Sequence, residues 1–409
     1  MKLRDYQKSI VNKGLPQLKK YKFLYLALEV RTGKTITSLS MSNLLPVSNA
    51  LFLTKKKAIS SIEDDYKMLG PSFKITVINY ESIHKIPQRG YDMVILDEAH
   101  SLGAFPKPSK RAKQVKSLIQ DNNCYVILLS GTPTPESYSQ MYHQVYGIPN
   151  NPFKDYVNFY KFSKHYVNVK QRKINSLYIN DYSDGLQTII DEMKPYTISY
   201  TQKEAGFKVS ISEEVCYVDI CPQVLEFVKR LKKDRVIQGK DEVILADTGV
   251  KLMSKTHQLY SGTVKFESGK SQVLCTAKGK FIQQKFKDTK IAIFYKFKAE
   301  LEALQEVYCN QLCENLEDFN TTNKSIALQI VSGREGISLR HAEALVYYNI
   351  DFSATSYWQS RDRMTTKDRL KNKIYWVFAK GGIEDKIYKA VVKKKDYTLN
   401  HFRKDLLDL

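Results

Sequence analysis

The run ALEVRTGKT at residues 27–35 ends in a glycine, a lysine and a threonine that could bind phosphate. In a phosphate-binding loop, written G-x-x-x-x-G-K-S/T, backbone amides after the last glycine surround the anion, the lysine neutralises it and the hydroxyl ligates Mg²⁺. Gly33, Lys34 and Thr35 fit that pattern, whereas Leu28 stands at the first glycine position. Because this tripeptide also occurs by chance, the run alone leaves both a nucleotide site and a coincidence open.

Two adjacent carboxylates, Asp97 and Glu98, end the apolar run MVILDE. Nucleotide hydrolysis needs one carboxylate to hold Mg²⁺ against the β- and γ-phosphates and another to orient and deprotonate water. An isolated pair of this kind is typical of a solvated strand end. Combined with the glycine-lysine-threonine run, the pair predicts an ATP site. The catalytic groups of that site would include Lys34, Asp97 and Glu98, and its Mg²⁺ ligands would be Thr35 and Asp97.

A sheet must place these groups where its strands end. Short runs of continuous apolar residues recur in the first 150 residues, at 23–28, 50–54, 75–79, 92–98 and 125–132. Continuous apolarity indicates strands covered on both faces, and hence a parallel sheet with crossover helices. Ligands of such a doubly wound α/β sheet collect at the carboxyl ends of the strands, where the Asp97–Glu98 pair also stands. We therefore predict a doubly wound α/β lobe over residues 1–150.

A second α/β rhythm starts near residue 213, with apolar runs at 290–297, 325–333, 344–350 and 373–379. We predict a second lobe over residues 213–409 and a linker or insertion over 151–212. The linker region is aromatic and basic, and its stretch DGLQTIIDEM predicts a helix. The tyrosines between Tyr156 and Arg172 fit either stacking on nucleic-acid bases or a small core.

The composition favours a polyanion as partner. The chain has 409 residues, with 64 lysines and arginines against 43 aspartates and glutamates, so its formal net charge is +21. A basic solvated surface would give the same balance, so the charge supports nucleic acid without naming it. No window reaches the ~18 uninterrupted apolar residues of a membrane span. We therefore expect a soluble, cytoplasmic protein without membrane contact.

The six cysteines predict no disulfide framework in a chain of this length. Cys124 lies in an apolar strand-like run, where a buried free thiol is expected. Cys309 and Cys313 are four residues apart and would share a helix face. Because no Cys or His pair of zinc-finger spacing accompanies them, we expect no metal site from cysteine.

These runs, taken in order along nearly the whole chain, resemble the motifs of superfamily-two helicases and translocases, and within them the Swi/Snf-type branch. LRDYQ (3–7) resembles the N-terminal motif in which Gln7 reads the adenine edge. LEVRTGKT (28–35) resembles motif I, with Arg31 at a common glycine position. The remaining matches in the first half are TKKK (54–57) for motif Ia, NYES (79–82) for Ib, DEAH (97–100) for II and SGTPT (130–134) for III.

The second half continues the resemblance. KIAIFYKF (290–297), VSGREGISL (331–339) and QSRDRM (359–364) resemble motifs IV, V and VI. The stretches at 251–262 and 381–396 resemble segments typical of the Swi/Snf branch. The resemblance implies two RecA-like doubly wound lobes, an ATP cleft between them, and a helical and aromatic insertion linking them.

The resemblance also implies roles for individual residues. The ATP-binding residues would be Arg4, Gln7, Thr32, Gly33, Lys34, Thr35, Gly336 and Gln359. Coupling between the lobes would involve His100, Ser130 and Thr132. DNA contacts would come from Lys55, Lys56, Asn79, Tyr80, Thr134, Ser332 and Gly333.

Motif VI departs from the family pattern of two arginines three residues apart. Arg363 fits the first arginine and is predicted to be catalytic, whereas the second falls on Thr366. Arg361 and Arg369 are the candidates to replace it. An arginine at this position stabilises charge on the γ-phosphate in the transition state.

The leading functional hypothesis is a DNA-dependent ATPase that uses ATP and Mg²⁺ to move on duplex DNA or to unwind forked or branched DNA. Replication, recombination or repair would be its setting, and the compact chain suits a bacterial or phage enzyme. Contacts to the DNA backbone carry little sequence specificity. The alternatives are an RNA helicase, a motor subunit of a larger complex, and a DNA-binding scaffold that does not hydrolyse ATP.

Overall fold

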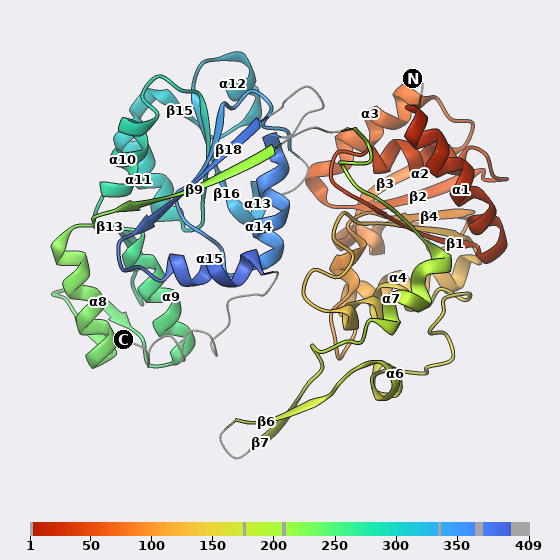
Figure 1. The fold of residues 1–409 in the computed structure, drawn as a ribbon, viewed down its shortest axis with the longest axis horizontal. Coiled ribbons are helices and arrows are strands. Elements are labelled where there is room, and N and C mark those ends of the chain that lie inside the picture. Colours follow the sequence, from red (N-terminus) through yellow and green to blue (C-terminus); the bar gives the residue numbers. More distant parts are fainter. Residues whose placement is uncertain (1–2, 175–176, 207–209, 334–336, 365–370, 394–409) are drawn as a thin grey trace. The chain divides into compact units, whose positions relative to one another are not determined.

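The computed structural model describes residues 3–174, 177–206, 210–333, 337–364 and 371–393. The chain divides into two units, residues 1–207 and 208–409. Within the described residues, each unit is built around its own six-stranded parallel sheet (Figure 1). The predicted fold class, two doubly wound α/β lobes, is confirmed.

The sheet of unit 1 has the strand order β3-β2-β4-β5-β1-β8, and all neighbouring strands are parallel. Its strands are β1 (Phe23–Leu28), β2 (Asn49–Thr54), β3 (Lys74–Asn79), β4 (Met93–Leu96), β5 (Tyr125–Leu129) and β8 (Thr197–Tyr200). The predicted apolar runs form β1 to β5 because both faces of this sheet are covered. In β4, for example, Val94 and Leu96 belong to one core, whereas Met93 and Ile95 belong to the other.

Helices of unit 1 cover both faces of this sheet. One face is covered by α1 (Asp5–Tyr21), α2 (Lys34–Ser42) and α3 (Ile59–Leu69). The other is covered by α4 (Lys110–Asn122), α5 (Met141–Gln144), α6 (Phe159–Tyr166) and α7 (Thr188–Met193). Short 3₁₀ turns are η1 (Lys56–Ala58), η2 (Tyr80–Lys85), η3 (Ala99–Leu102), η4 (Tyr138–Gln140) and η5 (Lys194–Tyr196).

The region assigned from the sequence to a linker contributes to unit 1. Strand β8 extends the sheet by pairing with β1, and α7 confirms the helix predicted in DGLQTIIDEM. Strands β6 (Lys170–Ile174) and β7 (Leu177–Asp181) form a separate antiparallel ribbon (Figure 1). Phe159 and Phe162 are 1% and 0% exposed and pack with Tyr142, so these aromatic residues belong to the core on one face of the unit 1 sheet.

The sheet of unit 2 has the strand order β15-β16-β14-β17-β18-β9, again with only parallel neighbours among the described strands. Its strands are β9 (Ser210–Val218), β14 (Ile291–Tyr295), β15 (Leu312–Cys313), β16 (Ser325–Gln329), β17 (Ala344–Tyr347) and β18 (Lys371–Ala379). Alternate residues of β17 serve two cores, with Leu345 and Tyr347 in one and Ala344 and Val346 in the other.

Unit 2 has helices on both faces of its sheet. They are α8 (Pro222–Asp234), α9 (Gly249–Tyr260), α10 (Ala277–Lys285), α11 (Lys298–Tyr308), α12 (Leu316–Thr321), α13 (Ile330–Gly333), α14 (Ala354–Ser360) and α15 (Glu384–Val392). Two small antiparallel ribbons are β10 (Val236–Gln238) with β11 (Val243–Leu245), and β12 (Thr263–Lys265) with β13 (Ser271–Val273). The 3₁₀ turns are η6 (Cys309–Gln311) and η7 (Arg361–Met364).

The expectation from the cysteines needs one correction. Cys221 and Cys275 form a disulfide, with Cα atoms 5.9 Å apart across 54 residues of sequence. Cys221 precedes α8 and Cys275 follows β13, so the fold alone brings them together. Cys124 is a buried free thiol, as predicted. None of the helices in the described part of the chain is long and apolar enough to cross a membrane.

Candidate nucleotide site

The loop between β1 and α2 has the backbone shape of a phosphate-binding turn. Gly33 lies immediately before α2 with φ of +81°, and Lys34 is the first residue of the helix. The amides at a helix N-terminus point outward and favour an anion. Arg31, at the position where the family often has glycine, also has a positive φ of +66°. The turn therefore needs a left-handed residue there, and arginine adopts that conformation at a cost of about 1–3 kcal/mol.

Lys34 lies where a phosphate-binding lysine would be expected. Its Nζ donates to the carbonyl oxygens of Leu28 at 3.1 Å and Glu29 at 3.4 Å, which belong to the same loop. Thr32 is fully buried, and its hydroxyl donates to the carbonyl of Glu29 at 2.7 Å. These hydrogen bonds join the side chains of Lys34 and Thr32 to backbone carbonyls at the start of the same loop. Thr35 follows on the first turn of α2 and is half-buried.

Helix α1 supports this loop from behind. The Gln7 amide is 4% exposed; its Nε2 donates to the carbonyl of Thr32 at 3.5 Å, and its Oε1 accepts from the Arg4 amide at 2.9 Å. A side chain at Gly33 would overlap the Gln7 amide, so glycine is required there by space as well as by φ. The structure thus brings the predicted residues Arg4 and Gln7 to motif I. Reading of adenine by Gln7 stays a prediction.

Sequence reasoning missed two tyrosines and a glutamine at this loop. Tyr6 donates through its hydroxyl to the Thr32 carbonyl at 3.1 Å, and its ring stacks on Tyr200 at 5.3 Å with an interplanar angle of 9°. Gln202 Nε2 donates to the Val30 carbonyl at 2.8 Å. Tyr200 ends β8, which lies in the region 151–212 that the sequence predicts to be a linker or insertion. The pairing of β8 with β1 brings Tyr200 and Gln202 to this loop, and the local sequence does not show that pairing.

The carboxylates of motif II follow β4 at the carboxyl edge of the same sheet. Asp97 Oδ2 accepts a hydrogen bond of 2.8 Å from the hydroxyl of Thr54, which ends the neighbouring strand β2. Burial, and then the negative charge of Glu98, raise the pKa of Asp97 to about 6, whereas the charge of Lys34 lowers it. Because β4 and β1 are parallel strands of one sheet, separated only by β5, motifs I and II lie at the same edge of that sheet. The sequence places Thr54 in motif Ia but does not predict its contact with Asp97.

The predicted site residues at this edge of the sheet offer oxygen atoms as metal ligands. Thr35 offers a hydroxyl, and Asp97 and Glu98 offer carboxylates. Mg²⁺ prefers oxygen ligands and usually takes only one or two protein carboxylates together with substrate phosphates. The donor set therefore fits the predicted Mg²⁺, with Thr35 and Asp97 as the residues that would hold it.

The residues predicted to couple the lobes form one hydrogen-bonded group. His100 Nδ1 lies 3.0 Å from the hydroxyl oxygen of Ser130 and 3.3 Å from Glu98 Oε2. The Thr132 amide donates to the same Ser130 hydroxyl oxygen at 3.1 Å. Motifs II and III are thus connected through a buried histidine. A role of these contacts in coupling stays a prediction.

One predicted DNA contact is wrong for its side chain. Tyr80 is 1% exposed and its hydroxyl donates to the Asp97 carbonyl at 2.6 Å, so its ring supports motif II from within the core. Tyr80 is the first residue of the 3₁₀ turn η2 and is buried there, which the local sequence does not show. Asn79 donates to Glu81 at 2.9 Å. Lys55 and Lys56 follow β2, and Lys56 is exposed. Thr134 is half-buried after β5.

The predicted residues of unit 2 fall partly outside the described structure. Ser332 and Gly333 lie in α13, whereas Gly336, Thr366 and Arg369 lie outside the described residues. Gln359 lies in α14 and Arg363 in η7, and they are 4% and 7% exposed. Arg363 Nε donates to the Gln359 carbonyl at 3.1 Å. Arg361, a candidate for the second arginine of motif VI, forms an ion pair of 2.7 Å with Glu213.

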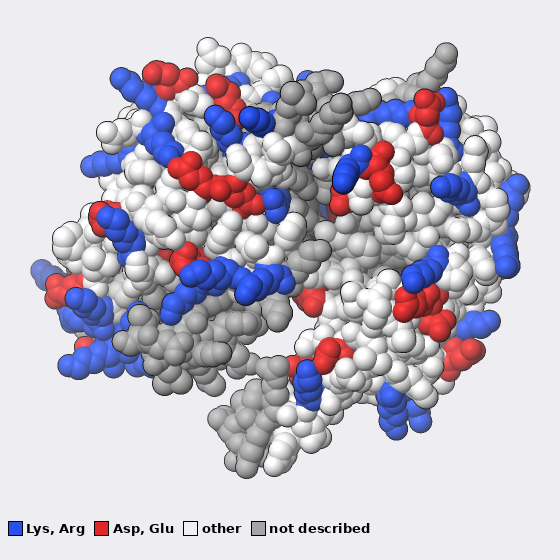
Figure 2. All heavy atoms as spheres, in the orientation of Figure 1, with Lys and Arg blue, Asp and Glu red and all other residues white. Residues whose placement is uncertain are grey.

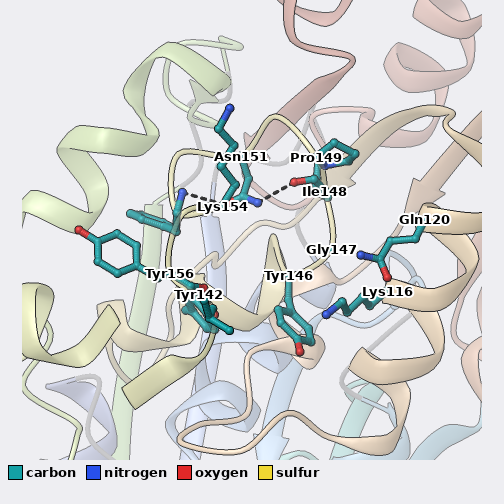
Figure 3. Close-up of a pocket in the computed structure, with 12 residues that line it drawn as sticks. Lys116, Gln120, Tyr142, Tyr146, Gly147, Ile148, Pro149, Asn151, Lys154 and Tyr156 are labelled. Carbon is teal, nitrogen blue, oxygen red and sulfur yellow. Dashed lines mark hydrogen bonds between the residues drawn. The ribbon is translucent and has the colours of Figure 1, made fainter. Parts of the chain in front are cut away.

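The surface of the described residues shows mixed charges and a recess in unit 1. Figure 2 shows lysine and arginine side chains on both units, interspersed with aspartate and glutamate on the face in view. A recess of about 270 Å³ in unit 1 is lined by residues of α4 and of the segment 142–157 (Figure 3). Lys116 lies at this recess with its Nζ 4.0 Å from the centre of the Tyr146 ring.

The sequence profile of one protein family, described as "SNF2-related domain", matches residues 49–259, which is more than half of the chain. The chain belongs to the SNF2-related domain family. The matched segment runs from β2 through motifs Ia, Ib, II and III to α9, so this SNF2-related chain carries the family pattern in both units. The Swi/Snf-type resemblance read from the sequence is confirmed at this level.

Comparison with solved structures finds the SWI2/SNF2 ATPase core of Sulfolobus solfataricus, once in complex with double-stranded DNA and once alone. Both are 14% identical to the SNF2-related chain, with TM-scores of 0.42. The alignments cover 96% of this chain and 91% and 89% of the two archaeal chains. No curated protein matches the chain.

Proposed function

We propose that this SNF2-related chain hydrolyses ATP held by the β1–α2 loop and uses the energy to move along duplex DNA. The observation that carries the proposal is that the loop with Lys34 follows β1 and Asp97 follows β4, both at the carboxyl edge of one parallel sheet. A cation for phosphate and a carboxylate for Mg²⁺ at that edge are the two requirements of nucleotide hydrolysis. Membership of the SNF2-related family supports the same reaction.

The residues divide the work as follows. The amides after Gly33 and the ammonium of Lys34 hold the β- and γ-phosphates, and Gln7 faces the adenine. Mg²⁺, held by Thr35 and Asp97, would neutralise charge on the phosphate oxygens. Glu98 orients the attacking water and takes its proton. Glu98 itself adopts a left-handed backbone conformation directly after β4, with φ of +48°.

We propose that Arg363 of unit 2 completes this site by stabilising the charge that develops on the γ-phosphate. Since ATP would then be held by groups from two units, binding and hydrolysis change how the units are arranged, and this change moves the protein along DNA. The contacts of His100 with Glu98 and Ser130 support the transmission of the change within unit 1. Forked or branched DNA in replication, recombination or repair is the narrower form of the proposal.

The DNA proposal predicts strong stimulation of ATP turnover by duplex DNA, with little dependence on base sequence. The net charge of +21 favours contacts to backbone phosphates, and such contacts release counterions. A footprint of even three phosphates would lower DNA affinity about 40-fold between 50 and 200 mM salt. The measurement is steady-state ATP turnover with duplex DNA, forked DNA, structured RNA and no nucleic acid, each as a salt series.

Lys34→Ala serves as the control in each of these reactions, because the proposal places Lys34 at the phosphates and therefore expects its loss to remove most of the DNA-stimulated turnover. Equal or greater stimulation by RNA would contradict the DNA proposal and favour an RNA helicase. Absence of turnover under all conditions, with nucleotide still bound, would favour a scaffold. Stronger stimulation by forked than by blunt duplex DNA would support the narrower proposal.

A further inference from the structure

Glu213, on the edge strand β9 of unit 2, is the common acceptor for side chains from four elements. Its carboxylate accepts from the Tyr357 hydroxyl of α14 at 2.9 and 3.0 Å, and from the Trp376 indole of β18 at 2.9 Å. It also accepts from the Tyr388 hydroxyl of α15 at 3.2 Å and forms the ion pair of 2.7 Å with Arg361 of η7. The Glu213 side chain is only 13% exposed. None of the sequence motifs includes this residue.

Packed aromatic rings hold the donors in place. The Trp376 ring is fully buried between Tyr347, at 3.8 Å, and Tyr357, at 5.4 Å, with interplanar angles of 17° and 23°. Burial and the charge of Glu213 raise the pKa of Tyr388 to about 12, so its hydroxyl keeps the proton that it donates. Rings packed in this way have few alternative rotamers, so the carboxylate has a fixed position.

The ion pair between Glu213 and Arg361 is shielded from water. Arg361 is 15% exposed, and its guanidinium lies 4.9 Å from the Trp358 ring centre and 5.3 Å from that of Tyr357. A charged pair in such surroundings is screened less than one on the surface. Removing one charge would leave the other buried and unpaired, which is strongly unfavourable. Arg361 is therefore held by Glu213 and stays in unit 2.

Arg361 and Arg363 belong to the same short turn, η7. Within that turn, Arg363 Nε donates to the Gln359 carbonyl at 3.1 Å, and its own carbonyl accepts from the Leu339 amide at 3.0 Å. Arg363 is thus held at its side chain and at its carbonyl, and the turn has a third anchor at Arg361. Because an arginine that acts on a transition state must be placed within a fraction of an ångström, anchors of this kind govern its rate effect.

We propose that Glu213 is a positioning residue for catalysis, which holds η7 through Arg361 so that Arg363 reaches the γ-phosphate. The inference rests on the role of Arg363 in the proposed function. It also gives the two arginines of η7 different roles: Arg361 forms the ion pair with Glu213, and only Arg363 acts on the nucleotide. Tyr388 extends the same anchor to α15, so the C-terminal segment typical of the Swi/Snf branch supports motif VI.

The test is Glu213→Gln, which keeps the size of the side chain and removes its charge. We expect kcat for DNA-stimulated ATP hydrolysis to fall at least tenfold and the KM for ATP to change less than twofold. The split follows because the arginine acts on charge that develops only in the transition state. Arg361→Gln should give the same split, and the double variant should be no slower than the slower single variant, because both changes release one anchor.

The neighbouring residue provides a matched control. Glu214 lies on the opposite face of β9, where it pairs with Lys285 at 2.8 Å and is 56% exposed, so Glu214→Gln should retain wild-type kcat. Tyr388→Phe removes one hydrogen-bond donor to Glu213 and leaves the ion pair of Glu213 with Arg361 intact. It serves as the second variant if Glu213→Gln is poorly folded. We expect a two- to fivefold lower kcat with unchanged KM, and wild-type kcat in Tyr388→Phe would overturn the inference in that case.

Several outcomes would separate this inference from the proposed function. Wild-type kcat in folded Glu213→Gln would overturn the positioning role, and so would a double variant whose loss of kcat is the product of the two single losses. The proposed function would remain intact in either case if Arg363→Ala is inactive. A change in KM without a change in kcat would also overturn the positioning role of Glu213. Wild-type turnover in Arg363→Ala would instead overturn the assignment of Arg363 in the proposed function.

Discussion

Replacing Lys34 by alanine is expected to lower ATP turnover on the order of 10³-fold, because a lysine of this kind stabilises charge on the transferred phosphoryl group. Its Nζ already lies at the carbonyls of Leu28 and Glu29, on the loop that the phosphates would occupy. Alanine leaves no cation there, so nucleotide binding should weaken as well. The measurement is a coupled assay of DNA-stimulated turnover together with a titration of a fluorescent ATP analogue.

Lys8→Ala is a suitable control for this change. Lys8 lies on α1, is 57% exposed and pairs only at the surface with Asp5, so its loss should leave turnover unchanged. Turnover of Lys34→Ala within tenfold of the wild type would contradict the assignment of the β1–α2 loop as the phosphate site.

Replacing Arg363 by alanine is expected to lower kcat by about 10³ to 10⁵, with nucleotide affinity changed only a fewfold. The different signature from Lys34→Ala arises because the arginine would contribute when charge develops on the γ-phosphate, not when ATP binds. Single-turnover hydrolysis at saturating nucleotide, beside a binding titration, measures the two effects separately.

Arg230→Ala, on the exposed surface of α8, is the matched control within unit 2 and should behave as wild type. A loss of affinity equal to the loss of turnover in Arg363→Ala would show that the arginine binds the ground state. Unchanged turnover would move the catalytic role to another arginine, and Arg369 would then be the first to replace.

Local patterns were sufficient for the fold and for the first-lobe motifs. The apolar runs of β1, β2, β4 and β5 are visible in the sequence because these strands are buried on both faces, so burial appears as continuous apolarity. Gly33 and Lys34 could be placed because a loop between a strand and a helix has a strict conformational requirement. The same reasoning located Asp97 at a strand end.

Contacts between distant residues were beyond reach of those patterns. Thr54 meets Asp97 because β2 and β4 are neighbours, although 43 residues separate them. Glu213 meets Trp376 across 163 residues. Nothing in the local sequence distinguishes Glu213 from Glu214, since alternation along an edge strand becomes informative only when the packed face is known. Tyr80 was misplaced for a related reason, because a single tyrosine after a strand carries no sign of the direction of its ring.

The most direct test is a crystal structure with a nonhydrolysable ATP analogue and Mg²⁺. The account predicts the triphosphate at the N-terminus of α2, with Lys34 Nζ at the β- and γ-phosphates and the metal ion between Thr35 and Asp97. A triphosphate bound elsewhere, or at that helix but with its base rather than its phosphates beside Lys34, would contradict it.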